Sequence, residues 1–143
     1  MSETTQIHPD KVRAYKATDY RLGHTNQDIV LTIGKHSQRL AKLFAGNSVN
    51  CGAFLTAYNP QGTIQSDEAN TQAHTELASK LQELGLHVIE GSGSEEGTEW
   101  PSEKSYFALG LELEPAKAIG THFDQDAIVW ADSGAAAQLI LLR

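Results

Sequence analysis

The chain has 143 residues, 40% of them hydrophobic and 20% charged, as expected for one globular domain and unlike a disordered chain. Its formal net charge of −7 argues against nucleic acid as the main partner, because phosphate binding needs a basic surface. A single cysteine, Cys51, excludes an internal disulfide. The polar N-terminus lacks a signal peptide's apolar core, and no run approaches the roughly 20 apolar residues of a membrane span. We therefore expect a cytoplasmic protein without a membrane partner.

The N-terminal half predicts a tail, two strands and a helix. Residues 1–13 have no apolar periodicity and are expected to form a flexible tail, which leaves one domain over residues 14–143. The elements that follow are expected at Ala14–Tyr20 (strand), Asp28–Ile33 (strand) and His36–Ala45 (helix, with Ser37 as N-cap and Gly46 as its stop).

The remaining chain gives a clearer pattern. After Ser66, apolar residues recur every three or four positions as far as Leu84, which predicts a long helix that Gly85 ends. The other elements are expected at Ala53–Tyr58, Leu86–Glu90 and Ser105–Leu113 (strands), from Pro115 (helix), and at Ala127–Ala131 and Gln138–Leu142 (a closing hairpin).

From Ala53 onward this order reads β-α-β-β-α-β with an extra strand, which is the order of a ferredoxin-like core. The sequence therefore predicts an α+β fold. We expect a mixed or antiparallel sheet with helices on one face, extended by N-terminal strands and a C-terminal strand.

Short connections make successive elements run in opposite directions, so alternate turns meet at one edge of the sheet. Tyr15 and the turn Gly34–Ser37 are expected at this edge. The polar residues expected to converge there, as a site for a small polar ligand, are Asn59, Ser66, Asn70, Glu103, Ser105 and Gln125. The alternative is that these residues only cap helices and form turns.

Several short blocks of the chain resemble a known family. They are Phe54–Pro60 (FLTAYNP), Ser66, Asn70, Trp100, Glu103–Ser105 (EKS) and Phe123–Ile128 (FDQDAI), with Tyr15, Thr18 and Tyr20 upstream. The set resembles domain of unknown function 3293, a family of small bacterial proteins, over most of the chain. That family usually has Phe-Gly-Gln-Asn-Ala in the late block, where this chain has Asp124 and Asp126. The resemblance implies a bacterial, cytosolic protein and supplies no activity.

The segment Gly91–Ser102 (GSGSEEGTEWPS) is rich in glycine. Glycine-rich loops can bind phosphate, but the carboxylates in this one would repel it, and no Walker motif is present. The simplest interpretation is a solvated hairpin loop. The alternative is a lid over the polar edge, with Trp100 as the side chain that excludes water.

Glu103 is the best candidate for general acid–base catalysis, because it precedes a strand and lies near Trp100, whose apolar surface would raise the pKa of the carboxyl group. A solvated residue at a strand start is the alternative. His122, Asp124 and Asp126 could join Glu103 around a divalent cation. A helix end and a capped turn explain them without one, so we assign no metal.

Two classes of function remain. The first is an enzyme acting on a small polar molecule, with Glu103 as acid or base, Asn59, Asn70 and Gln125 binding the substrate, and Lys35 or His36 supplying positive charge. The second is a non-catalytic metabolite-sensing or protein-interaction module, dimeric through its sheet or bound to a basic protein partner. The cofactor, if there is one, does not follow from the sequence.

Overall fold

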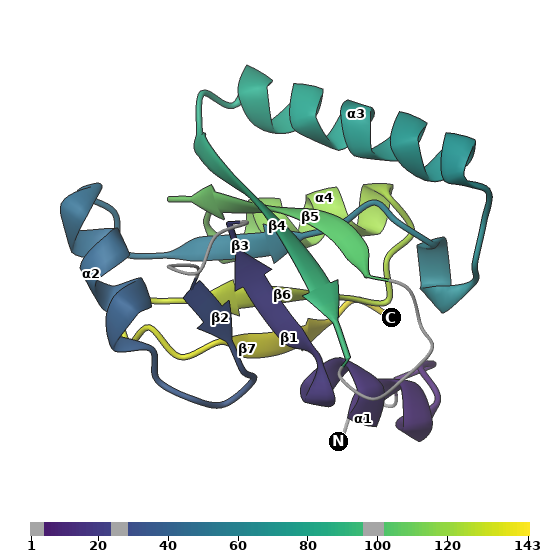
Figure 1. The fold of residues 1–143 in the computed structure, drawn as a ribbon, viewed down its shortest axis with the longest axis horizontal. Coiled ribbons are helices and arrows are strands. Elements are labelled where there is room, and N and C mark those ends of the chain that lie inside the picture. Colours follow the sequence, from purple (N-terminus) through teal and green to yellow (C-terminus); the bar gives the residue numbers. More distant parts are fainter. Residues whose placement is uncertain (1–4, 24–28, 96–101) are drawn as a thin grey trace.

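The structure, a computed structural model, describes residues 5–23, 29–95 and 102–143. The described residues form one antiparallel sheet of seven strands in the order β2-β1-β4-β5-β3-β6-β7 (Figure 1). In chain order the strands are β1 (Asp19–Leu22), β2 (Ile29–Leu31), β3 (Gly52–Leu55), β4 (His87–Ser94), β5 (Glu103–Leu109), β6 (Ala127–Ala131) and β7 (Gln138–Leu141). All six pairings are antiparallel, so the fold is α+β with an antiparallel rather than a mixed sheet.

Two of the helices match the predicted pattern of caps and apolar spacing. In α2 the Ser37 hydroxyl accepts from the Leu40 amide, and in α3 the Ser66 hydroxyl accepts from the Ala69 amide, as expected of N-caps. The helices are α1 (Pro9–Ala17), α2 (Gln38–Gly46), α3 (Asp67–Glu83) and α4 (Leu113–His122), with a short 3-10 turn η1 (Pro60–Gly62).

The N-terminal prediction was wrong. Pro9–Arg13, expected in a flexible tail, and Ala14–Ala17, expected to begin a strand, together form α1. Pro9 opens this helix, and the His8 ring accepts a hydrogen bond from the Asp10 amide. No residue of α1 is buried, so the helix lacks the apolar stripe from which helices are predicted.

The two faces of the sheet carry separate apolar clusters, because alternate residues of a strand point to opposite faces. Leu77 of α3 and Ile119 of α4 pack with Leu55 on one face. Leu40 of α2 packs with Phe54 on the other face. The expectation that all helices cover one face was therefore wrong for α2.

The sheet is curled. Strands β2 and β7 lie at opposite edges, yet the segments beside them meet in a bridge between His36 and Ala136, and the Gly34 amide donates to the Ala137 carbonyl. The turn Gly34–Ser37 thus lies next to the turn between β6 and β7, at the opposite end of β6 from the predicted polar edge. The prediction that this turn lies at the polar edge was wrong. It assumed that the chain reverses direction after a strand at Ala14–Tyr20, but Ala14–Ala17 belong to helix α1.

Several element boundaries differ from the prediction, among them those of β4, β3 and β5. β4 extends to Ser94, into the glycine-rich segment, because β1 pairs along it, and at Gly91 a Cβ would lie 2.2 Å from the Arg21 carbonyl oxygen. β3 ends at Leu55 rather than Tyr58. β5 ends at Leu109, where Gly110 turns the chain with a φ of +83°. None of the helices within the described residues combines the length and apolarity needed to cross a bilayer.

Candidate functional site

A pocket of about 350 Å³ lies at the end of the sheet where β3 and β4 finish and β5 and β6 begin. Helix α1 lies at this end, and α2 lies at the other (Figure 1). The larger apolar side chains of the lining are Tyr20, Phe54, Ile128, Val129 and Leu139. Of these, Tyr20, Phe54 and Val129 belong to the cluster on the face that α2 also covers. The pocket is thus a hollow in the curled sheet, with α1 beside its mouth.

Four of the predicted site residues line this pocket. Asn59, Glu103, Ser105 and Gln125 come from three separate segments, since Glu103 and Ser105 both lie on β5, and the reversals of the chain bring these segments together as the sequence predicts. Of these, Asn59, Ser105 and Gln125 are buried.

Asn59 is held by a network of side-chain amides. Its backbone amide donates to Asn70 Oδ1 at 2.9 Å, and its own Oδ1 accepts from Asn70 Nδ2 at 3.0 Å. The Gln65 amide also donates to Asn59 Oδ1. These bonds keep Asn59 at a φ of +45°, a left-handed conformation that asparagine adopts more readily than most residues.

Glu103 receives a hydrogen bond from this network. Asn59 Nδ2 donates to Glu103 Oε2 over 2.8 Å, which places the carboxylate on the pocket wall at the start of β5. The structure therefore orients Glu103 through Asn59, and Asn59 through Asn70.

Gln125 and Ser105 both use their donor atoms within the protein. Gln125 Nε2 donates to the carbonyl oxygens of Tyr58 (3.1 Å) and Phe123 (3.3 Å). The Ser105 hydroxyl donates to the Glu103 carbonyl oxygen at 3.1 Å. In both side chains the oxygen keeps acceptor capacity toward the pocket.

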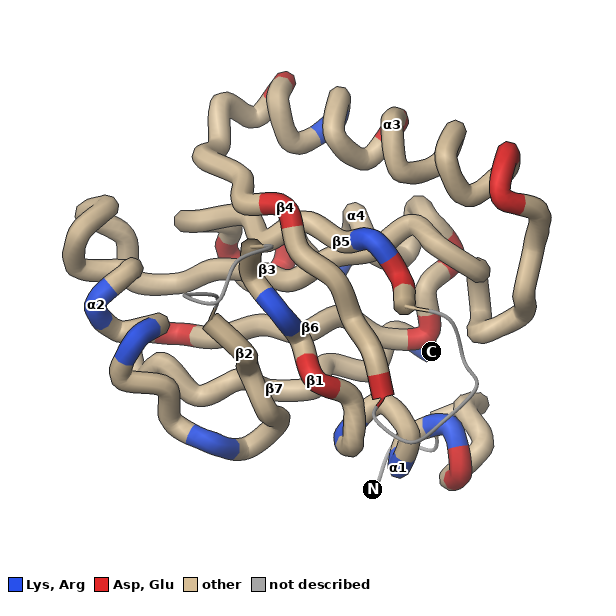
Figure 2. Tube along the Cα trace, viewed as in Figure 1, with Lys and Arg blue, Asp and Glu red and all other residues tan. Residues whose placement is uncertain are grey.

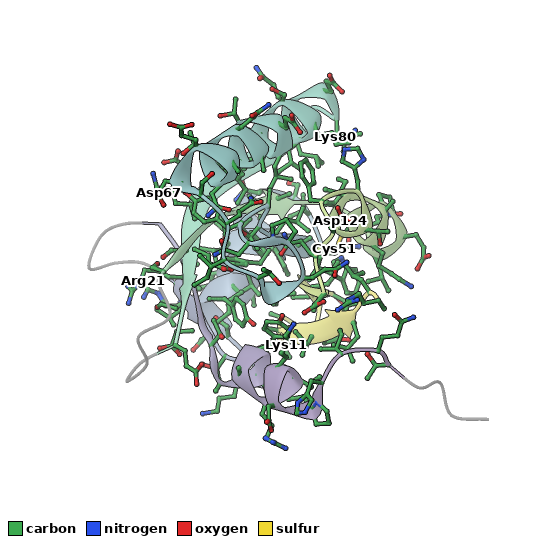
Figure 3. All side chains as sticks on the ribbon, turned by 90° about the vertical axis from the view of Figure 1, so that its right-hand side faces the viewer. Lys11, Arg21, Cys51, Asp67, Lys80 and Asp124 are labelled. Atoms are coloured by element: carbon green, nitrogen blue, oxygen red, sulfur yellow. The ribbon has the colours of Figure 1, made fainter. Side chains whose placement is uncertain are left out.

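Helix α1 closes on the pocket through Asp126, whose side chain is only 1% exposed. The Tyr15 hydroxyl donates to Asp126 Oδ2 at 2.6 Å, and Arg143 Nε donates to Oδ1 at 2.6 Å. Lys11 Nζ lies 3.8 Å from Oδ2 and donates to the Gln61 carbonyl, which places Lys11 on the inner side of α1 (Figure 3). Burial, followed by the hydrogen bond to Asp126, raises the pKa of Tyr15 above its ordinary value, so its hydroxyl stays protonated.

The other predicted residues have different positions. Ser66 is exposed at the N-cap of α3 and does not line the pocket. Asn70 is buried behind Asn59 and acts on the pocket only through it. Trp100 lies outside the described residues, as does the half of the proposed lid that spans residues 96–101. Lys35 and His36, expected to supply positive charge, lie with the Gly34–Ser37 turn at the far end of the sheet. Among the described lining residues, Lys11 carries the positive charge instead.

The carboxylates at this end do not form a metal site among the described residues, where no group of three or more His, Cys, Asp or Glu side chains is arranged to hold an ion. Asp126 is instead bound by Tyr15 and Arg143. Asp124 is exposed and has a φ of +55°, a conformation that favours glycine. Glycine is the usual residue at this position in the family that the chain resembles.

The pocket lining includes residues that the sequence did not predict for the ligand site, among them Lys11, Thr56 and Asp126. A usable signal for Lys11 was Pro9 after His8, a helix start that would have placed α1. Tyr15, Thr18 and Tyr20, which carried part of the family resemblance, also line the pocket.

Comparison with known proteins gives one match. No curated protein and no solved structure is significantly similar to this chain. The family model described as protein of unknown function (DUF3293) matches residues 55–128, a range that contains Asn59, Glu103, Ser105 and Gln125. The match covers just over half of the chain and confirms the resemblance inferred from the sequence, so the chain belongs to this family.

Proposed function

We propose that this protein binds a small polar molecule in the pocket beside α1. One observation carries the proposal: a single cavity of about 350 Å³ combines an apolar floor with the side chains of Asn59, Glu103, Ser105 and Gln125. Ligand sites in proteins are concave, mostly apolar, and furnished with a few polar groups that orient the ligand. The pocket has this composition, and its size suits a compact molecule.

Glu103 is the residue proposed to act on the bound molecule as general acid or base. Its carboxylate lies on the pocket wall and is oriented by the 2.8 Å hydrogen bond from Asn59. A carboxyl group so held can exchange a proton with a substrate within hydrogen-bond reach. The alternative is a non-catalytic metabolite-sensing module, in which the same carboxylate only binds.

The setting of the pocket is proposed to be a ferredoxin-like core in a cytoplasmic protein. The adjacent strands β4-β5-β3-β6, with α3 joining β3 to β4 and α4 joining β5 to β6, support the core. The single cysteine, which needs no oxidising compartment, supports the location.

A pair of neighbouring substitutions tests whether this pocket is the site. Gly93 lines it, and a Cβ there would meet only ordinary contacts, the nearest at 3.6 Å from Thr18. Gly93→Leu should therefore fold and fill the cavity. Ser92→Leu adds the same side chain to the opposite face of β4 and is the control.

The measurement is thermal-shift screening with nucleotides, amino acids and sugars. A compound that stabilises the wild type and Ser92→Leu but not Gly93→Leu supports the pocket. Equal stabilisation of both variants would place its binding elsewhere and contradict the proposal.

Glu103→Gln, compared with Glu83→Gln on the exposed side of α3, separates the two forms of the proposal. Turnover that Glu103→Gln abolishes while binding persists identifies an acid–base enzyme. Binding without turnover by the wild type identifies a sensing module.

A further inference from the structure

The hydroxyl groups along the α1 side of the pocket donate to the protein itself. Tyr15 donates to Asp126 Oδ2, Tyr20 to the Tyr15 carbonyl at 2.5 Å, and Thr18 to the Ala14 carbonyl at 2.8 Å. Each acceptor is a carboxylate or carbonyl oxygen that cannot donate, so the direction of each bond is fixed. These hydroxyl groups therefore offer a ligand their oxygen lone pairs and no proton.

The hydroxyl groups on the sheet side of the pocket also donate to carbonyl oxygens of the protein. The Thr56 hydroxyl donates to the Lys104 carbonyl at 2.8 Å, and the Ser105 hydroxyl donates to the Glu103 carbonyl. Ser94, exposed at the mouth, is the exception among the described hydroxyl groups of the lining. The inner wall thus presents acceptors on both sides.

Gln125 extends this pattern with a buried amide. Only 8% of the residue is exposed, and its Nε2 lies between the carbonyl oxygens of Tyr58 and Phe123, which fixes the orientation of the amide. Its Oε1 accepts no hydrogen bond from the described residues and is not among their buried, unpartnered atoms. Gln125 therefore directs an acceptor into the cavity.

The charged side chains of the pocket lining are mostly acidic. Asp10, Glu95, Glu103 and Asp126 line the pocket, and Lys11 is the one cation among the described lining residues. Lys11 is itself bound to Asp126 and to the Gln61 carbonyl. Figure 2 shows an acidic position at the end of β4, next to α1, and another at the start of β5. Asp10 and Asp126 are themselves paired with Arg13 and Arg143. An anionic ligand would also meet the acidic side chains of Glu95 and Glu103, which repel it.

We propose that the ligand of this pocket is an organic cation: an amine attached to a compact apolar or aromatic body. The inference rests on the proposed function and names its substrate class. The ammonium group donates to the acceptors of the inner wall, with Glu103 as its counter-ion. The apolar body packs on Phe54, Val129 and Leu139 at the floor.

The test is a matched panel in which only the polar group changes. Tryptamine, tryptophol and indole-3-acetate share one ring system, as do 2-phenylethylamine, 2-phenylethanol and phenylacetate. Affinities are measured by calorimetry at low salt, where surface screening is weak. We expect both amines to bind on the order of tenfold or more tightly than the matched carboxylates, as for charge-assisted hydrogen bonds. The alcohols should bind with intermediate affinity.

Two variants make the outcome decisive. Glu103→Gln should reduce the preference for amines over alcohols several-fold, and Gly93→Leu should abolish binding of every compound. Carboxylates that bind as tightly as amines, and are displaced by Gly93→Leu, would overturn the cationic ligand and leave the pocket in place. If no compound binds, or if Gly93→Leu binds them as the wild type does, both the ligand class and the proposed function fail.

Discussion

At the scale of single residues, His74 carries the one buried side-chain atom without a hydrogen-bond partner among the residues that the structure describes. Its ring stacks on Tyr106 with centroids 4.3 Å apart, and Tyr58 meets it edge-on at 5.8 Å. His74 Nδ1 is buried and makes no hydrogen bond with the described residues. Burial, and secondarily the charge of Lys104, lower the pKa of His74. The ring contributes by stacking rather than by hydrogen bonding.

His74→Phe should therefore stabilise the fold by about 1 kcal/mol at pH 7.5, because it keeps the stacking and removes an unpaired buried nitrogen. Below a pH of about 6.5 the unfolded chain protonates His74 while the folded chain resists, so the wild type loses stability as the pH falls. The His74→Phe variant has no imidazole at this position, so protonation of residue 74 does not lower its stability as the pH falls. Urea denaturation at pH 7.5 and pH 5 measures both effects, with the exposed His122→Phe as control. A loss of stability in His74→Phe at both values would contradict the argument.

The amide network behind Glu103 makes a second prediction. Asn70→Ala removes an acceptor from the Asn59 backbone amide and a donor from Asn59 Oδ1, both in a buried position. We expect a loss of about 1–3 kcal/mol of unfolding free energy. Gln72→Ala, exposed on the same helix, is the matched control and should change little. Equal urea midpoints for the two variants would show that the network does not hold the turn.

The sequence predicts part of this site and misses part of it for one physical reason. Asn59, Glu103 and Gln125 follow or precede elements whose direction alternates, so chain order alone brings them to one end of the sheet. Tyr15 meets Asp126 across 111 positions of sequence, through a helix without an apolar stripe. Nothing local in the sequence encodes that contact.

At the scale of elements, the capped helices were predicted best. Ser37 and Ser66 begin α2 and α3 as expected, and Gly85 follows α3 with a φ of +71°. Both helices bury apolar residues at helical spacing, whereas α1 buries none. Helix prediction from periodicity therefore succeeds where a helix packs on the core and fails where it packs through polar contacts.

The N-cap of α3 gives an element-scale prediction. Ser66→Ala removes the hydroxyl that accepts from the Ala69 amide at 3.1 Å, and should cost about 1 kcal/mol. Ser66→Asp keeps an acceptor and adds a charge that the helix dipole favours, so it should retain the stability of the wild type. Because Ser66 does not line the pocket, neither variant should change ligand affinity. Chemical denaturation and titration of the same samples check both statements.

The turn after α4 gives another element-scale prediction. Asp124 has a φ of +55°, where a β-branched side chain is strained and glycine is not. Asp124→Gly should leave stability within about 0.5–1 kcal/mol of the wild type, and Asp124→Val should lose more than that. Thermal unfolding of the pair tests the conformation directly. A valine variant as stable as the glycine variant would rule out the left-handed turn.

At the scale of the whole molecule, the curl of the sheet forms the pocket, and the hydrogen bonds of Tyr15 and Tyr20 hold helix α1 beside it. The bridge between His36 and Ala136 draws the edges of the sheet together, and α1 lies at the end away from α2. The hydroxyl of Tyr20 donates to the Tyr15 carbonyl, and that of Tyr15 to Asp126. Helix α1 is therefore held to the sheet by a chain of hydrogen bonds that requires both phenols to be protonated.

Alkaline pH should break that chain. Burial is the largest cause that raises the pKa of Tyr15 and of Tyr20 above the ordinary value of 10.0, and the Glu103 charge raises both further. Below about pH 10 both states of the protein hold these protons, so the contribution to stability is complete. Above it the unfolded chain ionises first, and the stability of the fold falls as the pH rises.

Replacing both tyrosines by phenylalanine should cost stability at pH 8, where the hydrogen bond to Asp126 is lost, and should flatten the decline above pH 10. Thr56→Val, which removes a pocket hydroxyl that does not titrate in this range, is the control and should keep the steep decline. Urea denaturation from pH 8 to 11 gives the slopes, and tyrosinate absorbance shows how many phenols titrate late. A double variant whose stability falls with pH as steeply as that of the wild type would mean that the two phenols do not couple α1 to the sheet.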